Sequence, residues 1–93
     1  MVKEVRASHI LVGSQEKAIE ISNLIQANMK TFENAAIEYS KCPSRKKGGD
    51  LGWFTRGKMV REFENAAFSA KKNELVIVKT QFGWHVIKKT DEK

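Results

Sequence analysis

Two apolar runs near the end of the chain, Leu75-Val76-Ile77-Val78-Lys79 and Phe82-Gly83-Trp84-His85-Val86-Ile87-Lys88-Lys89, are rich in β-branched and aromatic residues and predict two strands. The runs are joined around Gln81, so they predict a β-hairpin. Asn73 precedes them and suits a turn, because asparagine tolerates positive φ better than most residues. This end of the chain therefore predicts an antiparallel pair of strands.

The other end of the chain predicts a strand followed by a helix. From Val2 to Val12, apolar and polar residues alternate with the period of a strand. Gly13 ends this strand, and Ser14 is a candidate N-cap for a helix. The apolar positions of that helix recur at helical spacing up to Met29, and we expect it to end near residues 28–30.

The middle of the chain predicts two further helices and one short strand. Thr31 is placed to cap a helix that stops before Pro43. The stretch 42–52 holds the only proline, three glycines and several cations, so we expect an exposed loop there. A short strand, 51–54, and an amphipathic helix, 59–70, follow. The chain thus predicts an α+β fold with a four-stranded, mainly antiparallel sheet surrounded by helices, in the order β-α-α-β-α-β-β.

Length and composition restrict the class of protein. The 93 residues suit a single domain, 1–93. Seventeen Lys and Arg against eleven Asp and Glu give a net charge of +6. The single cysteine, Cys42, cannot form an internal disulfide, and no apolar leader or run of about 20 apolar residues is visible. We therefore expect a cytoplasmic protein that acts as a monomer.

Five segments, taken in chain order, resemble the parvulin family of peptidyl-prolyl cis-trans isomerases. They are Ser8–Val12, Tyr39–Ser44, Gly48–Phe54, Arg56–Val60 with Phe63-Glu64, and Thr80–Ile87. Each is weak alone, but their order and spacing make chance a poor explanation, and the likeness extends from about Val5 to Lys89. The resemblance implies the parvulin fold and prolyl isomerase activity on unfolded or flexible polypeptides that contain proline, with no metal or organic cofactor.

Catalysis of X-Pro isomerisation requires an apolar binding pocket. Rotation about an X-Pro bond is slow because it breaks amide resonance, with a barrier of about 18–20 kcal/mol. An enzyme can favour the twisted amide with an apolar cup, a dry environment and polar groups suited to the rotated carbonyl. The resemblance assigns substrate binding to Leu51, Phe54, Met59, Phe63 and Phe82. From periodicity alone, an ordinary hydrophobic core is the better interpretation of these residues.

The resemblance assigns the catalytic positions to His9, Cys42, Thr80 and His85. It implies that the histidines form a hydrogen-bonded pair at the floor of the site, which tunes Cys42 and is bridged by Thr80. Two satisfied core histidines are the alternative. Cys42 could act as a nucleophile, but isomerisation needs no covalent intermediate, so a polar role is favoured. Zinc binding by the cysteine and the histidines is disfavoured, because no CxxC or HxxxH spacing occurs.

Two features bear on substrates and partners. Phosphate-directed parvulins carry cations in a longer loop after the first strand, whereas here that loop is only residues 13–16 with Lys17 nearby, so we expect no dependence on phosphorylation. The basic segment Lys41–Arg61 contains seven cations and one acid, Asp50. It favours acidic proteins, an anionic membrane surface or nucleic acid as partners, and the alternative is a solvated face.

Two other functions fit parts of the sequence. A binding module or holdase would use the same apolar groove to grip proline-containing segments without turning them over. A nucleic-acid adaptor would use the basic segment, but the aromatic residues occupy positions typical of a core rather than alternating with cations on a surface. The family resemblance favours prolyl isomerisation, and exchange spectroscopy on short X-Pro peptides would separate it from binding without turnover.

Overall fold

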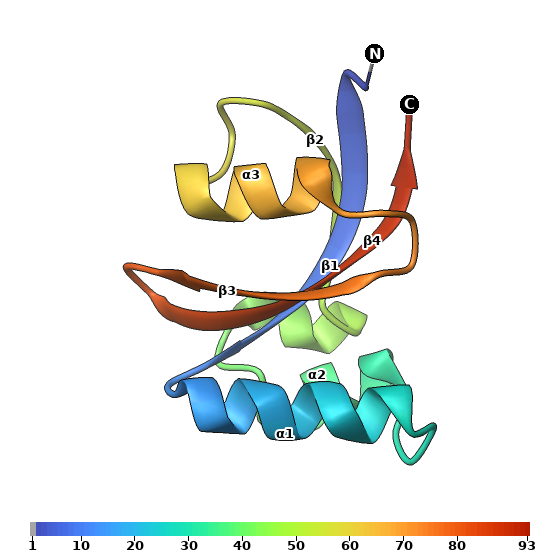
Figure 1. Ribbon diagram of the computed structural model, residues 1–93, viewed down its shortest axis with the longest axis vertical. Coiled ribbons are helices and arrows are strands. Elements are labelled where there is room, and N and C mark those ends of the chain that lie inside the picture. The colour runs from blue at the N-terminus through green and yellow to red at the C-terminus, as the bar shows by residue number, and fades with distance from the viewer. Residues whose placement is uncertain (1) are drawn as a thin grey trace.

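The computed structural model describes residues 2–93, which form a four-stranded sheet with helices on both faces (Figure 1). The strands are β1 (Glu4–Val12), β2 (Asp50–Thr55), β3 (Leu75–Thr80) and β4 (Gly83–Glu92), and the α-helices are α1 (Gln15–Gln26), α2 (Phe32–Tyr39) and α3 (Arg61–Ser69). The strand order is β2-β1-β4-β3, and every neighbouring pair is antiparallel. The predicted α+β class and element order are confirmed.

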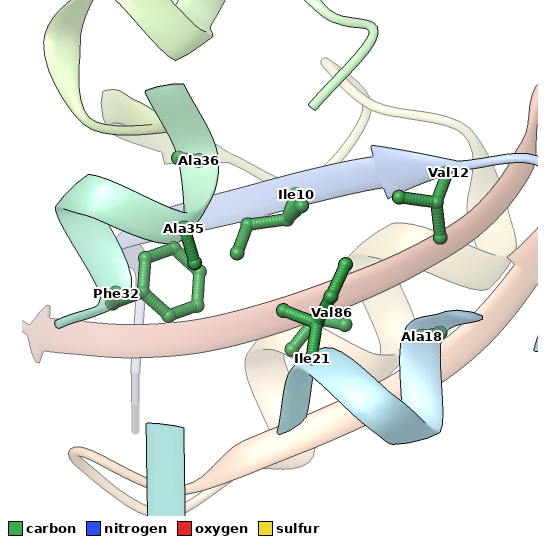
Figure 2. Packing of buried hydrophobic residues seen from close by; sticks show 8 residues of the cluster. All are labelled: Ile10, Val12, Ala18, Ile21, Phe32, Ala35, Ala36 and Val86. Carbon is green, nitrogen blue, oxygen red and sulfur yellow. The ribbon is translucent and has the colours of Figure 1, made fainter. Parts of the chain in front are cut away.

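The alternation in β1 places its side chains in two separate cores. Ile10 and Val12 point to the face covered by α1 and α2, as Figure 2 shows. Val5 and Ala7 point to the opposite face, which α3 covers. Buried residues that join the first core are Ala18, Ile21, Phe32, Ala35, Ala36 and Val86. Because both faces of the sheet are covered, β1 is buried along most of its length.

Two predicted N-caps are confirmed. The side-chain oxygen of Ser14 accepts a hydrogen bond from the backbone N–H of Lys17 at 3.2 Å. Thr31 accepts one from Asn34 at 3.1 Å. These bonds satisfy N–H groups that have no partner within the helix, which is why both helices begin where the sequence indicates.

The predicted end of α1 is wrong by about one turn. The helix ends at Gln26, because Asn28 adopts a left-handed conformation with φ of 60° that a helix cannot continue. Met29 therefore lies outside the helix with 73% of its surface exposed, and it does not contribute to the packed face. The turn between α3 and β3 agrees with the prediction, because Asn73 has a φ of 69°.

Two segments near the site also differ from the prediction. The stretch expected to be an irregular loop contains a 3₁₀ turn, Pro43–Lys47, before β2 begins at Asp50. The third helix begins at Arg61 rather than Met59. A turn comes before it, because Glu64 of α3 accepts a hydrogen bond from the backbone N–H of Gly57 and draws residues 56–59 over the end of the helix. The longest described helix has twelve residues, and none between residues 2 and 93 could cross a bilayer.

Candidate active site

A cavity of about 480 Å³ opens on the side of the sheet that α3 covers. Its walls come from β1, β2, β4 and α3, and from three connecting segments: the start of the 3₁₀ turn with the residues before it, the turn before α3 and the turn between β3 and β4. The lining residues are His9, Leu11, Lys41, Cys42, Pro43, Leu51, Lys58, Met59, Val60, Phe63, Phe82 and His85. Most of these side chains are apolar, so the cavity offers a dry surface to an apolar group.

Four of the five residues predicted to bind substrate line this cavity. Leu51, Met59, Phe63 and Phe82, which we call the proline cup, come from four separate parts of the chain. Phe82 is 62% exposed at the mouth of the cavity. Phe54 does not line it. Its ring packs behind Phe63, with centroids 6.2 Å apart, and supports the wall of the cup.

The two histidines form the floor of the cavity. They lie on neighbouring antiparallel strands, β1 and β4, where the register pairs His9 with Ile87 and Leu11 with His85. This diagonal arrangement brings Nδ1 of His9 to 3.0 Å from Nδ1 of His85. The ring of Phe63 meets both imidazoles edge to face, with centroids 5.3 Å from His9 and 5.2 Å from His85. The predicted histidine pair is therefore present, and an aromatic wall of the cup packs on it.

Thr80 extends this network toward the mouth of the cavity. Its Oγ1 lies 2.7 Å from Nε2 of His85 and accepts a hydrogen bond from the backbone N–H of Phe82 at 3.1 Å. Thr80 is buried and does not itself line the cavity. It therefore bridges to the histidine pair, as predicted, and it also holds the backbone of the exposed aromatic residue at the rim, which the sequence did not indicate.

The hydrogen bonds assign tautomers to the pair. If Thr80 uses its proton to donate to Nε2 of His85, then His85 carries its proton on Nδ1 and donates it to Nδ1 of His9. His9 then carries its proton on Nε2, an atom that is buried and has no hydrogen-bond partner among the described residues. In the opposite arrangement, His9 donates from Nδ1 to His85, and His85 donates from Nε2 to Thr80. The hydroxyl proton of Thr80 would then have no acceptor, and Nε2 of His9 would still have no partner. The first arrangement satisfies more groups and leaves one N–H donor unpaired beside the cavity.

Burial keeps both imidazoles neutral. It lowers the pKa of His9 to about 4, with repulsion from His85 as the second cause. Burial also lowers the pKa of His85. At neutral pH, the floor of the site therefore carries hydrogen-bonding groups without a net charge.

Cys42 lies at the edge of the cavity, half-buried, immediately before the 3₁₀ turn. Its backbone N–H donates to Oγ of Ser40 at 3.3 Å, which positions the residue. Within residues 2–93, no hydrogen bond joins its sulfur to His9 or His85, so any tuning of Cys42 by the pair acts through space. Over the same residues, the cysteine and the two histidines do not gather as a metal-ligand group.

Five lining residues were not predicted from the sequence. Lys41 and Pro43 flank Cys42, Lys58 and Val60 flank Met59, and Leu11 follows His9 at the two-residue spacing of one strand face. The strand period could have identified Leu11. The two lysines gave no such signal, because a solvated cation in a basic stretch has the same pattern.

The comparisons with known proteins agree with this geometry. The model of the PPIC-type PPIase domain family matches residues 1–93. The chain belongs to this family. It is 50% identical over 92 residues to foldase protein PrsA 1 of Bacillus cereus, covering 97% of this chain and 32% of that protein. The chain therefore spans about a third of the length of this curated relative, so the family shown here is that of the domain.

Solved structures of PPIC-type domains and parvulins share the fold. The PrsA peptidylprolyl isomerase of Bacillus anthracis superposes with a TM-score of 0.95 at 39% identity, covering 99% of this chain and 43% of that one. The parvulin NmPin of Nitrosopumilus maritimus superposes with a TM-score of 0.85 at 39% identity, covering 94% of this chain and 95% of that one. The predicted family is confirmed, and peptidyl-prolyl isomerisation is the activity that the family match and these relatives support.

Proposed function

We propose that this domain accelerates cis-trans isomerisation of X-Pro bonds in flexible polypeptides by holding the proline ring in the proline cup. The observation that supports this most directly is the convergence of Leu51, Met59, Phe63 and Phe82 on one cavity above a buried, neutral histidine pair. An apolar pyrrolidine ring fits such walls, and exclusion of water from the amide favours the twisted state, which has less charge separation than the planar amide.

The step needs no covalent bond to the protein. The cup would hold the ring while the preceding carbonyl rotates, and no bond of the substrate is broken except the partial double bond of the amide. Cys42 lies beside this path as a polarisable, half-buried group.

Magnetisation exchange between the cis and trans signals of an Ala-Pro peptide would test the function. We expect the domain at catalytic concentration to raise the exchange rate, and we expect Cys42→Asp and Cys42→Ala to keep a large part of that rate. Loss of activity in both variants with the fold intact would support an obligatory thiol. Binding of the peptide without faster exchange would leave a holdase as the function.

Several finer features of the protein remain part of this proposal. Independence from phosphorylation is supported by the connection between β1 and α1, which is only Gly13-Ser14 and has no cation. Phosphorylation before proline should therefore not raise turnover by orders of magnitude. Among partners of the basic segment, acidic polypeptides fit best, because Lys41 and Lys58 belong to the substrate cavity itself. Docking on anionic membrane or nucleic acid, a cytoplasmic location and a monomeric state stay predictions.

A further inference from the structure

Among the described residues, 2–93, two lysines are the only ones that line the cavity and carry a charge when the histidines are neutral. Lys41 and Lys58 lie on separate segments, one before the 3₁₀ turn and one in the turn before α3. Every other lining side chain is apolar, a neutral imidazole or a thiol. A substrate that enters the proline cup therefore meets two cations beside an apolar surface.

Lys41 is held at this position by its own backbone, and Lys58 by the anchored turn that carries it. The backbone N–H of Lys41 donates to the carbonyl of Leu11 at 2.8 Å, and its ammonium lies so close to Gly13 that a Cβ added there would be 3.2 Å from Nζ. The turn that carries Lys58 is anchored by Glu64, which accepts from the backbone N–H of Gly57 and pairs with Arg56 at 3.2 Å. Both cations are therefore fixed at their base and free only along their side chains.

Neither ammonium is neutralised from within the described part of the chain. Across residues 2–93, no carboxylate lies within 4 Å of Lys41 or Lys58. Asp50, the one acid of the basic segment, is held by Arg6 at 2.6 Å. A carboxylate brought by a substrate would be the partner that these lysines lack.

We infer that Lys41 and Lys58 make the domain selective for prolines that have an acidic residue directly beside them in sequence. The inference rests on the proposed function and extends it to substrate class. Consecutive Cα atoms are 3.8 Å apart, so a side chain next to a proline held in the cup lies within reach of the residues that line the same cavity. A polypeptide with Asp or Glu at this position satisfies the apolar cup and the two cations together.

The selectivity is moderate in size, because both ammonium groups are exposed to water. A solvent-exposed ion pair contributes little, and two such contacts correspond to about a three- to tenfold gain in kcat/KM for an acidic peptide over its neutral isostere. Lysine acts here as a point charge rather than as a planar fork, so the gain is far below the effect of a dedicated phosphate site.

Matched peptides test the inference. The exchange rate of Ala-Glu-Pro-Phe is compared with that of Ala-Gln-Pro-Phe, and that of Ala-Pro-Glu-Phe with that of Ala-Pro-Gln-Phe. We expect the acidic member of at least one pair to be turned over faster at about 0.02 M salt, and the advantage to shrink toward one at about 0.5 M salt, where the Debye length falls to a few ångströms.

Substitution of the two lysines by glutamine tests whether they cause the preference for acidic peptides. Lys41→Gln and Lys58→Gln should each reduce the ratio of the acidic to the neutral exchange rate, and the double variant should bring that ratio to about one. Lys71→Gln removes the same charge beyond α3, away from the cavity, and should leave the advantage unchanged.

Three outcomes would overturn the inference. Equal rates for acidic and neutral peptides at low salt, with Ala-Pro peptides still turned over, would contradict the selectivity and leave the proposed function standing. An acidic advantage that survives the double variant, or that Lys71→Gln reduces equally, would show that net charge rather than the cavity lysines is responsible. Failure to accelerate any peptide would contradict the proposed function and this inference together.

Discussion

Thr80 connects the buried histidine pair to the rim of the cavity through a single hydroxyl. Thr80→Val keeps the shape and removes the donor to His85 and the acceptor for Phe82. We expect the free energy of unfolding to fall by about 1–3 kcal/mol, the range for an unsatisfied buried polar group, and exchange activity to fall with it. Urea unfolding and peptide exchange measure the two effects. Thr80→Ser keeps the hydroxyl and should retain most of both, and equal losses in the two variants would contradict the role of the hydrogen bonds.

His9 predicts a pH dependence of stability. Its pKa is about 4 in the folded protein and about 6.5 when unfolded, so between these values the unfolded chain binds the proton more readily. The contribution of neutral His9 to the free energy of unfolding is complete above pH 6.5 and is lost as pH falls toward 4. For a pKa lowered by this amount, the loss is about 3 kcal/mol. Urea unfolding between pH 4 and 7.5, with the imidazole signals followed by NMR, checks this. A His9 signal that titrates near pH 6.5 in the folded protein would contradict it.

At the scale of elements, β2 enters the sheet through Gly49, where an added Cβ would meet the backbone of β1. Gly49 has a φ of 88°, and a Cβ there would lie 2.5 Å from the carbonyl oxygen of His9. Gly52 has a φ of 74° with nothing within 4 Å of its Cβ position. Gly52→Ala should therefore cost only the backbone strain, about 1–3 kcal/mol, whereas Gly49→Ala should cost several kcal/mol more. Urea unfolding compares the two, and equal costs would contradict the close approach to His9.

The turn before α3 depends on Glu64. Its carboxylate pairs with Arg56 and accepts from Gly57, which positions Lys58 and Met59 at the cavity. Glu64→Ala should raise KM and lower kcat/KM about three- to tenfold, because a mobile turn must be ordered when substrate binds. Glu62→Ala, in the same first turn of α3 but without an ion pair between residues 2 and 93, should change KM little. Equal kinetics in the two variants would contradict the anchoring role.

The elements that sequence could predict are those with a strong local signal. The alternation of β1, the caps Ser14 and Thr31 and the β-branched hairpin each have a period or a hydrogen bond that acts within a few residues. The predicted end of α1 near residue 28 was wrong because it depends on the left-handed conformation of Asn28. The predicted start of α3 at residue 59 was wrong because it depends on the contact between Gly57 and Glu64. Such contacts leave no periodic trace.

At the scale of the whole molecule, the cavity exists because the topology gathers distant segments. The order β2-β1-β4-β3 places His9 beside His85, which are 76 residues apart, and the turn before α3 closes the cup above them. The family resemblance indicated seven of the twelve lining residues, whereas periodicity alone could not distinguish the cup from an ordinary core. Phe54 shows what periodicity cannot predict. Its position in the strand predicts that it is buried, but not that it packs behind Phe63 instead of lining the cavity.

The central claim is that the proline ring of a substrate is held in the cup formed by Leu51, Met59, Phe63 and Phe82. Intermolecular NOEs between a bound Ala-Ala-Pro-Phe peptide and the protein test it most directly. We predict NOEs from the pyrrolidine protons to the Met59 methyl group, the Leu51 methyl groups and the Phe63 ring. A bound peptide whose pyrrolidine protons show NOEs only to residues outside this cavity would contradict the account.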